Sequence, residues 1–154
     1  MRGWDHPDIL SLEWVAQTDV PKVLYGADIL FLPYSFREGS RHLVETAFPS
    51  KTADYLAAGK PILVVGPPYS TLVQYASEEG FAEVVTEPNV DMLAHAIQRI
   101  VLFPEHARML AARAHDVFYR NHDIERQRRD FRALLQMAVS GNGNRRVGAR
   151  LRPC

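Results

Sequence analysis

Short apolar runs alternate with segments of helical spacing over most of the chain. The runs of strand length cover residues 9–15, 29–32, 61–65 and 82–85. The segments that favour helices cover residues 20–25, 51–58, 71–79, 90–103, 105–121 and 124–138. Runs that are apolar on both faces are typical of strands covered on both sides, as in a parallel sheet. The order of these elements predicts an α/β fold with a Rossmann-like parallel sheet, flanking helices and further C-terminal helices.

Local signals mark several of the predicted boundaries. Asp19 and Ser70 are predicted N-caps of the helices that follow them. Gly59 and Gly80 stand just after their helices, where a left-handed backbone is common. The polar residues 34–47 are predicted to form a long loop, and loops of this length inside a compact domain are often functional.

The last helical segment has an apolar stripe whose partner the pattern does not identify. It consists of Phe131, Leu134, Leu135 and Ala138. If nothing covers this stripe, we expect dimerisation or poor solubility, because uncovered apolar patches associate. The segment also contains arginines interleaved with acids, which is typical of a solvated helix face. These arginines are Arg126, Arg128, Arg129 and Arg132.

Charge is unevenly distributed along the 154 residues, although the formal net charge is zero. Residues 1–139 contain 14 basic and 18 acidic side chains, and residues 140–154 contain four arginines and no acid. An acidic body is a poor general nucleic-acid binder, because phosphate contacts need clustered positive charge. Residues 1–8 are expected to be a lead-in, residues 9–138 the folded domain, and residues 139–154 a disordered basic tail. A solvated tail is the preferred interpretation, and peripheral contact with anionic lipid is the alternative.

Cysteine usage and the absence of a targeting pattern favour a cytoplasmic protein. The single cysteine, Cys154, allows no disulfide within the chain and no cysteine metal cage. The N-terminal residues have no apolar stretch of the kind found in signal peptides. The longest uncharged run, residues 61–77, is interrupted by three prolines and a glycine, so no membrane-spanning helix is expected.

Candidate chemistry lies where predicted strands end, because ligands of open parallel sheets bind beyond the carboxyl ends of the strands. Residues 48–51 lead into a helix whose first turn offers free N–H groups and a partial positive charge, both suited to phosphate. Lys51 adds a full charge. Asp54 lies three residues later on the same face, where a carboxylate can accept hydrogen bonds from a sugar diol. The alternative is a capped helix whose Lys51 and Asp54 are simply solvated.

The residues around this helix resemble the donor-site helix and following strand of family 4 glycosyltransferases of the GT-B fold. The resemblance is carried by residues 48–64, FPSKTADYLAAGKPILV, and by residues 20–35, VPKVLYGADILFLPYS. It continues through Pro88 and the helix at residues 91–103, and so covers about residues 9–138. The resemblance implies that the chain is an incomplete half of a GT-B fold, its C-terminal, donor-binding domain.

The resemblance also implies a function and a set of site residues. It implies retaining transfer of a sugar from a nucleotide-diphosphate donor, with no cofactor and no obligatory metal. The diphosphate would be held by the backbone around Phe48, Pro49, Ser50 and Lys51, and the ribose by Asp54, where the family usually has glutamate. The family's other acid falls on Thr46, so Glu45, one residue earlier, is the candidate catalytic acid if the loop shifts. Independently of the family, His42 either hydrogen-bonds a donor phosphate or is an ordinary loop residue.

The chain departs from the family by lacking an acceptor domain and the first strands of the donor domain. We therefore expect a fragment, a truncated product or one half of a split enzyme, with a missing N-terminal domain or partner chain. Alone it should be weakly active or inactive, because acceptor binding is lost. The alternative is a non-catalytic α/β remnant or partner-binding module. The nucleotide, sugar, acceptor and oligomeric state stay open.

Two histidine–aspartate pairs raise a metal hypothesis. They are His115-Asp116 and His122-Asp123, but further ligands at suitable positions are lacking, so exposed polar residues are the preferred interpretation and no metal is expected. Nucleophile-elbow, dinucleotide-binding and Walker patterns are absent from the sequence. The turn at residues 66–68 either borders a donor base or is a rigid connection.

Overall fold

Three parallel strands form the centre of the fold. The computed structural model describes residues 14–139. The strands are β1 (Leu30–Pro33), β2 (Ile62–Val65) and β3 (Ala82–Val85), in the order β1-β2-β3. Leu30 lies opposite Ile62 on β2, and Ile62 lies opposite Ala82 on β3. The predicted parallel α/β architecture is thus confirmed.

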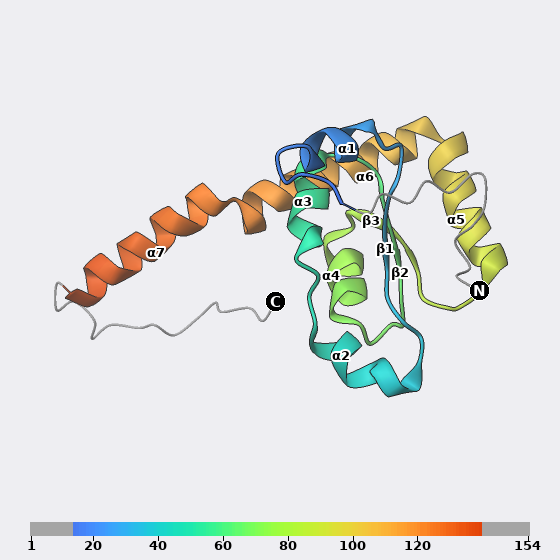
Figure 1. Ribbon diagram of the computed structural model, residues 1–154, viewed down its shortest axis with the longest axis horizontal. Helices are drawn as coiled ribbons and strands as arrows, with labels where there is room; N and C mark the ends of the chain where they lie inside the picture. The colour runs from blue at the N-terminus through green and yellow to red at the C-terminus, as the bar shows by residue number, and fades with distance from the viewer. Residues whose placement is uncertain (1–13, 140–154) are drawn as a thin grey trace.

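Helices connect the strands and cover both faces of the sheet. Before and between the strands lie α1 (Val20–Gly26), the 3₁₀ turn η1 (Glu38–Ser40), α2 (Arg41–Thr46), α3 (Lys51–Ala58) and α4 (Thr71–Glu79). After β3 come α5 (Val90–Leu102), α6 (Pro104–Val117), the π-helical turn η2 (Phe118–His122) and α7 (Ile124–Val139). Figure 1 shows α3 and α4 on one side of the sheet and α5 on the other.

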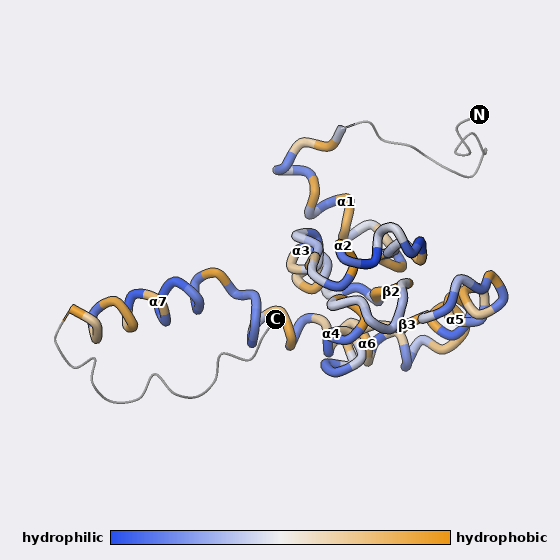
Figure 2. Tube along the Cα trace, turned by 90° about the horizontal axis from the view of Figure 1, so that it is seen from below, coloured by the Kyte–Doolittle hydropathy of each residue, from blue (hydrophilic) through white to orange (hydrophobic). Residues whose placement is uncertain are grey.

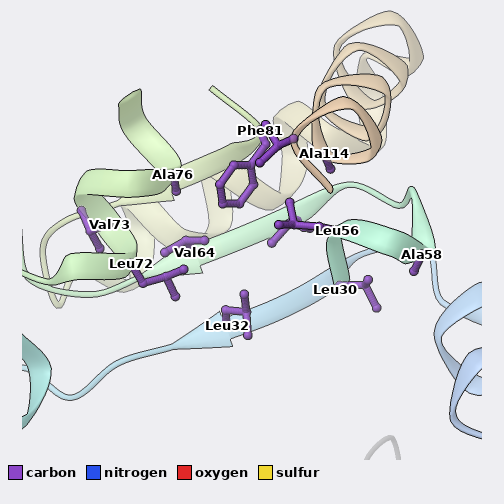
Figure 3. Close-up of a cluster of buried hydrophobic side chains, with 12 residues drawn as sticks. Leu30, Leu32, Leu56, Ala58, Val64, Leu72, Val73, Ala76, Phe81 and Ala114 are labelled. Atoms are coloured by element: carbon purple, nitrogen blue, oxygen red, sulfur yellow. The ribbon is translucent and has the colours of Figure 1, made fainter. Parts of the chain in front are cut away.

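The larger hydrophobic cluster lies between the sheet and α3, α4 and α6. Leu56 of α3, Leu72 of α4 and Val64 of β2 are fully buried there, as is Phe81, which stands just before β3. Figure 3 shows these side chains gathered between the strands and the covering helices. Burial of this apolar surface is the main force that holds the three layers together.

The opposite face of the sheet is covered over two of its three strands. Ile100 and Ala96 of α5 pack there with Leu63 of β2 and Val85 of β3. Phe31 of β1 lies in register with Leu63, on the same face, yet it is 45% exposed. The expectation that every strand is covered on both sides is therefore wrong for β1, because α5 packs against β3 and no helix within residues 14–139 covers β1 on this face.

Most predicted boundaries are confirmed where local signals mark them. Gly59 and Gly80 adopt left-handed φ values of 59° and 66° at the ends of α3 and α4. The Ser70 hydroxyl accepts a hydrogen bond from the Val73 amide at 3.5 Å, so Ser70 caps α4 as predicted. Asp19 precedes α1 but makes no capping bond: its backbone is already helical, with φ −99° and ψ −13°, and its carboxylate pairs with Lys22 at 2.9 Å.

Two predicted segments need correction. Residues 34–47 are not one long loop, because η1 and α2 lie within them and α2 buries Val44. The helix predicted at residues 105–121 ends at Val117 and continues as the π-helical turn η2. Trp14 and Val15 lie outside any strand, while the rest of the strand predicted at 9–15, the lead-in 1–8 and residues 140–154 lie outside the described residues.

The final helix stands apart from the layers just described. Figure 1 and Figure 2 both show α7 running away from the sheet and the other helices. None of its residues is buried, so the predicted solvated arginine face is confirmed. Across residues 14–139, no helix has the length and apolar character needed to cross a bilayer.

Candidate functional site

A cavity of about 440 Å³ lies where β1 ends and α3 begins. Its wall combines Pro33 and Tyr34 at the end of β1, Leu43 from α2, and the segment from Ala47 to Lys51. The remaining lining residues are Phe31, Leu32, Tyr55 and Leu72. Its position beyond the carboxyl end of a parallel strand is the usual place for a ligand in this type of fold.

Tyr34 holds the cavity wall in place. Its amide donates to the Val65 carbonyl at 2.6 Å, and its hydroxyl donates to the Ala47 carbonyl at 2.6 Å, so it joins β2 to the segment before α3. A Cβ on Gly66 would lie only 2.9 Å from the Tyr34 Cβ, so a glycine is needed for this close approach. Burial raises the pKa of the Tyr34 phenol above its ordinary value.

The first turn of α3 presents positive charge to the cavity. Ser50 and Lys51 are both exposed, and the Ser50 side chain makes no capping bond to the helix. The Thr52 amide is bonded to the Pro49 carbonyl at 3.0 Å. Because helix N-termini carry about half a positive charge, the ammonium of Lys51 and the helix dipole act in the same direction. This turn suits an anionic group of a ligand.

The Thr52 hydroxyl is buried without a partner. Its oxygen makes no hydrogen bond within the described part of the chain, although the residue is fully buried. Thr52 does not line the cavity, although Ser50 and Lys51, which precede it, do. An unpaired buried hydroxyl costs stability relative to an apolar side chain of the same shape.

Asp54 borders a different hollow from Lys51. Lys51 and Tyr55 line the large cavity, whereas Asp54 lines a hollow of about 140 Å³ between α1 and α3. The other residues of this hollow are Val20, Pro21, Leu24, Tyr25, Ala57 and Ala58. Asp54 is exposed rather than directed into the interior. Burial, and secondarily the charge of Asp54, raises the pKa of Tyr55.

Four of the predicted site residues come together and three do not. Phe48, Pro49, Ser50 and Lys51 share the large cavity. His42 and Glu45 lie on α2 and do not line it. Both are exposed residues, and the Glu45 carboxylate accepts a hydrogen bond from the Arg41 guanidinium at 2.8 Å. The catalytic role of Glu45 and the phosphate contact of His42 stay predictions.

Two contacts hold α2 beside the cavity, one from the first residue of α4 and one from the segment just before α4. The Thr71 hydroxyl donates to the backbone carbonyl of Glu45. The Arg41 guanidinium lies 4.6 Å from the centre of the Tyr69 ring, within the range of a cation–π contact. With α2 in this position, Leu43 lines the cavity, whereas His42 and Glu45 do not.

An aromatic cluster behind the cavity was not predicted. Phe48 packs edge-on against Tyr75 at 5.5 Å between ring centres and lies parallel to the His122 ring at 6.2 Å. The Tyr75 hydroxyl is 2.9 Å from His122 Nε2 and accepts a hydrogen bond from the side-chain amide of Asn121 at 3.0 Å. The cluster joins the cavity wall to the turn between α6 and α7. Nothing local in the sequence signals it, because its members come from distant segments.

His122 is half-buried in this cluster, so the interpretation of it as an exposed polar residue is wrong. Burial lowers its pKa, and the charge of Glu79 opposes that shift more weakly. His115 is exposed as expected and contacts Tyr119. Within residues 14–139, no three His, Cys, Asp or Glu side chains lie together in a way that could hold a metal ion.

The described wall of the cavity offers groups suited to binding an anion. Among residues 14–139, its wall contains one ammonium, several aromatic rings and apolar side chains, but no Asp, Glu, His or Cys. Such a wall can hold an anionic group next to an apolar or ring-shaped one. In comparisons with known proteins, no family model, no curated protein and no solved structure matches this chain.

Proposed function

We propose that this chain binds the nucleotide-diphosphate part of an activated sugar, as the donor-binding half of a retaining glycosyltransferase. The observation that carries the proposal is the cavity at the start of α3, where Lys51 and a helix N-terminus face a wall whose other described residues are uncharged. Two negatively charged phosphates fit there because the ammonium and the helix dipole both stabilise them. The resemblance of residues 20–35 and 48–64 to family 4 donor domains supports the same ligand.

The ribose and base would extend along α3 toward α1. Asp54 lies one helical turn after Lys51, and its carboxylate is exposed for hydrogen bonds from the ribose hydroxyls. The hollow beside Asp54 contains Pro21 and Tyr25, and Tyr25 is 58% exposed. An exposed aromatic ring beside a ribose site offers a stacking surface for a base.

Binding and catalysis separate in this proposal. The part of the cavity wall that the structure describes contains no carboxylate, and the Glu45 carboxylate, which does not line it, is paired with Arg41. A leaving diphosphate would be stabilised by Lys51 and by the backbone at the start of α3. The acceptor and the groups that activate it would come from a second domain or chain, so the chain alone binds donor without efficient transfer.

The test is ligand-observed NMR on the full chain with UDP, GDP and their sugars. We expect saturation transfer to the nucleotide, and an affinity about tenfold weaker in Lys51→Ala, because a charge-assisted hydrogen bond is lost. Asp54→Ala should weaken contact with the ribose protons. Lys60→Ala is the matched control, because Lys60 follows the other end of α3 and should leave the affinity unchanged.

A second candidate function is a non-catalytic module that binds a partner chain. The observation that favours it is the exposed Phe31 on the uncovered face of β1, at an edge of the sheet that pairs with no other described strand. Absence of saturation transfer at millimolar nucleotide would favour this module over donor binding. So would an equal loss of nucleotide affinity in Lys51→Ala and Lys60→Ala.

A further inference from the structure

The α7 helix is exposed over its whole length. It has 16 residues, none of them buried, and it extends away from the body of the protein in both whole-chain views (Figures 1 and 2). An isolated helix of this length is only marginally stable in water, and amphipathic helices gain most of their stability by packing their apolar face. The helix therefore has a surface suited to a partner that the described residues do not supply.

The apolar residues of α7 share one side of the helix. At about 100° per residue, Ile124, Phe131, Leu135 and Ala138 fall within one narrow sector, with Leu134 at its border. Phe131, Leu134 and Leu135 are 62%, 57% and 50% exposed. Hydrophobic and hydrophilic residues alternate along α7 in Figure 2, as this spacing requires.

Positive charge borders this apolar sector. The helix contains four arginines and two acids, an excess of two positive charges, whereas the residues before it are acidic overall. Arg128 and Arg132 lie beside the apolar sector on the same flank. Arg128 pairs with Glu125 at 2.9 Å, but Arg129 and Arg132 form no ion pair with any residue that the structure describes. Long arginine stems can cover apolar surface while their charged ends reach outward.

We propose that α7 is an interfacial helix that lies on anionic lipid bilayers, with Phe131 and Leu135 inserted and the flanking arginines at the headgroups. A basic helix with a well-defined apolar side has the form of known membrane-surface helices. Anionic lipid complements the net positive charge of the helix. Because α7 extends away from the body, the helix can reach a surface without bringing the acidic body against it (Figure 1).

The same features disfavour a second copy of the chain as the partner. Pairing two α7 helices would bring together two helices that each have a net charge of +2. The heptad pattern is also short and interrupted, because Gln127 and Arg128 occupy the seam between Ile124 and Phe131. A coiled coil normally needs three or four uninterrupted heptads. Charge complementarity therefore selects the anionic surface.

The test is co-sedimentation of the full chain with vesicles of phosphatidylcholine alone or phosphatidylcholine with phosphatidylserine. We expect binding to the phosphatidylserine vesicles that decreases with added salt. Phe131→Ser with Leu135→Ser should reduce it by about tenfold or more. Arg128→Gln and Arg132→Gln should each reduce it by about fivefold. Ala133→Ser, on the opposite side of α7, is the control and should bind like the parent.

Three outcomes would overturn the proposal. They are equal binding to both kinds of vesicle, binding that survives the Phe131 and Leu135 changes, and a stable dimer by light scattering that those changes dissolve. The variants should keep the urea unfolding midpoint of the parent, because α7 contributes nothing to either hydrophobic cluster. Nucleotide binding is independent of this surface, so failure here leaves the proposed donor site untouched.

Discussion

The two edges of the sheet are constructed differently. At β3, the sheet is packed against α4, α5 and α6, and the Glu83 carboxylate is bonded to Arg99 at 2.9 Å and to His106 at 2.7 Å. At β1, Phe31 is 45% exposed and the strand ends in the large cavity. The β3 edge is thus closed by packing and ion pairing, while no described helix covers the corresponding face at the β1 edge. Stability and binding should accordingly depend on different edges.

The largest expected effect compares two large apolar side chains at the same face of the sheet, Ile100 from the covering helix α5 and Phe31 from β1. Ile100 of α5 is 4% exposed where that helix packs on the sheet, so Ile100→Ala should lower the free energy of unfolding by about 2–5 kcal/mol. Phe31→Ala removes a half-exposed ring and should cost less than about 1 kcal/mol. Urea unfolding followed by circular dichroism measures both. Equal costs would show that β1 is as well covered as β3.

A smaller effect is expected where β2 approaches β1. Gly66→Ala places a methyl group against the Tyr34 Cβ and should cost about 1–3 kcal/mol, since neither backbone can move freely. It should also displace Tyr34 and weaken nucleotide binding. Gly39→Ala is the matched control, because nothing lies within 4 Å of its added Cβ, and we expect a change of less than about 0.5 kcal/mol. A tolerated Gly66→Ala would mean that the cavity wall yields easily.

The smallest effect is a pH dependence of the unfolding free energy that arises from His122, behind the cavity. Because burial lowers the pKa of His122, the unfolded chain takes up its proton at a higher pH than the folded chain does. The stability due to neutral His122 is fully present above its ordinary pKa of 6.5 and is lost as the pH falls through the lowered value. Unfolding free energies measured across this range should fall less steeply in His122→Gln. An unchanged slope in His122→Gln would contradict the assignment.

Elements with strong local signals could be predicted from the sequence. Helices α3 and α4 match their predicted ranges because glycines end them, and Ser70 also caps α4. The cavity residues from Phe48 to Lys51 could be found as well, because they are contiguous and precede a helix. Lys51 and Asp54 share the exposed side of α3, but the sequence does not reveal that they border separate hollows.

Features that depend on tertiary packing could not be predicted. The apolar run of β1 resembles that of β2, and only the position of α5 decides which of them is covered on both faces. The stripes of α6 and α7 have similar spacing, yet Leu110 of α6 is buried and Leu134 of α7 is exposed. The stacking of Phe48 on His122 joins residues far apart in the chain, so no local pattern indicates it.

The central claim is that the first turn of α3 binds the diphosphate of a nucleotide. Titration of the isotopically labelled protein with UDP or GDP, followed through its backbone amide resonances, tests this claim most directly. The account predicts that the amides of Lys51, Thr52 and Ala53 shift most and that these shifts diminish in Lys51→Ala. Shifts that are absent there, or that concentrate on another part of the chain, would contradict it.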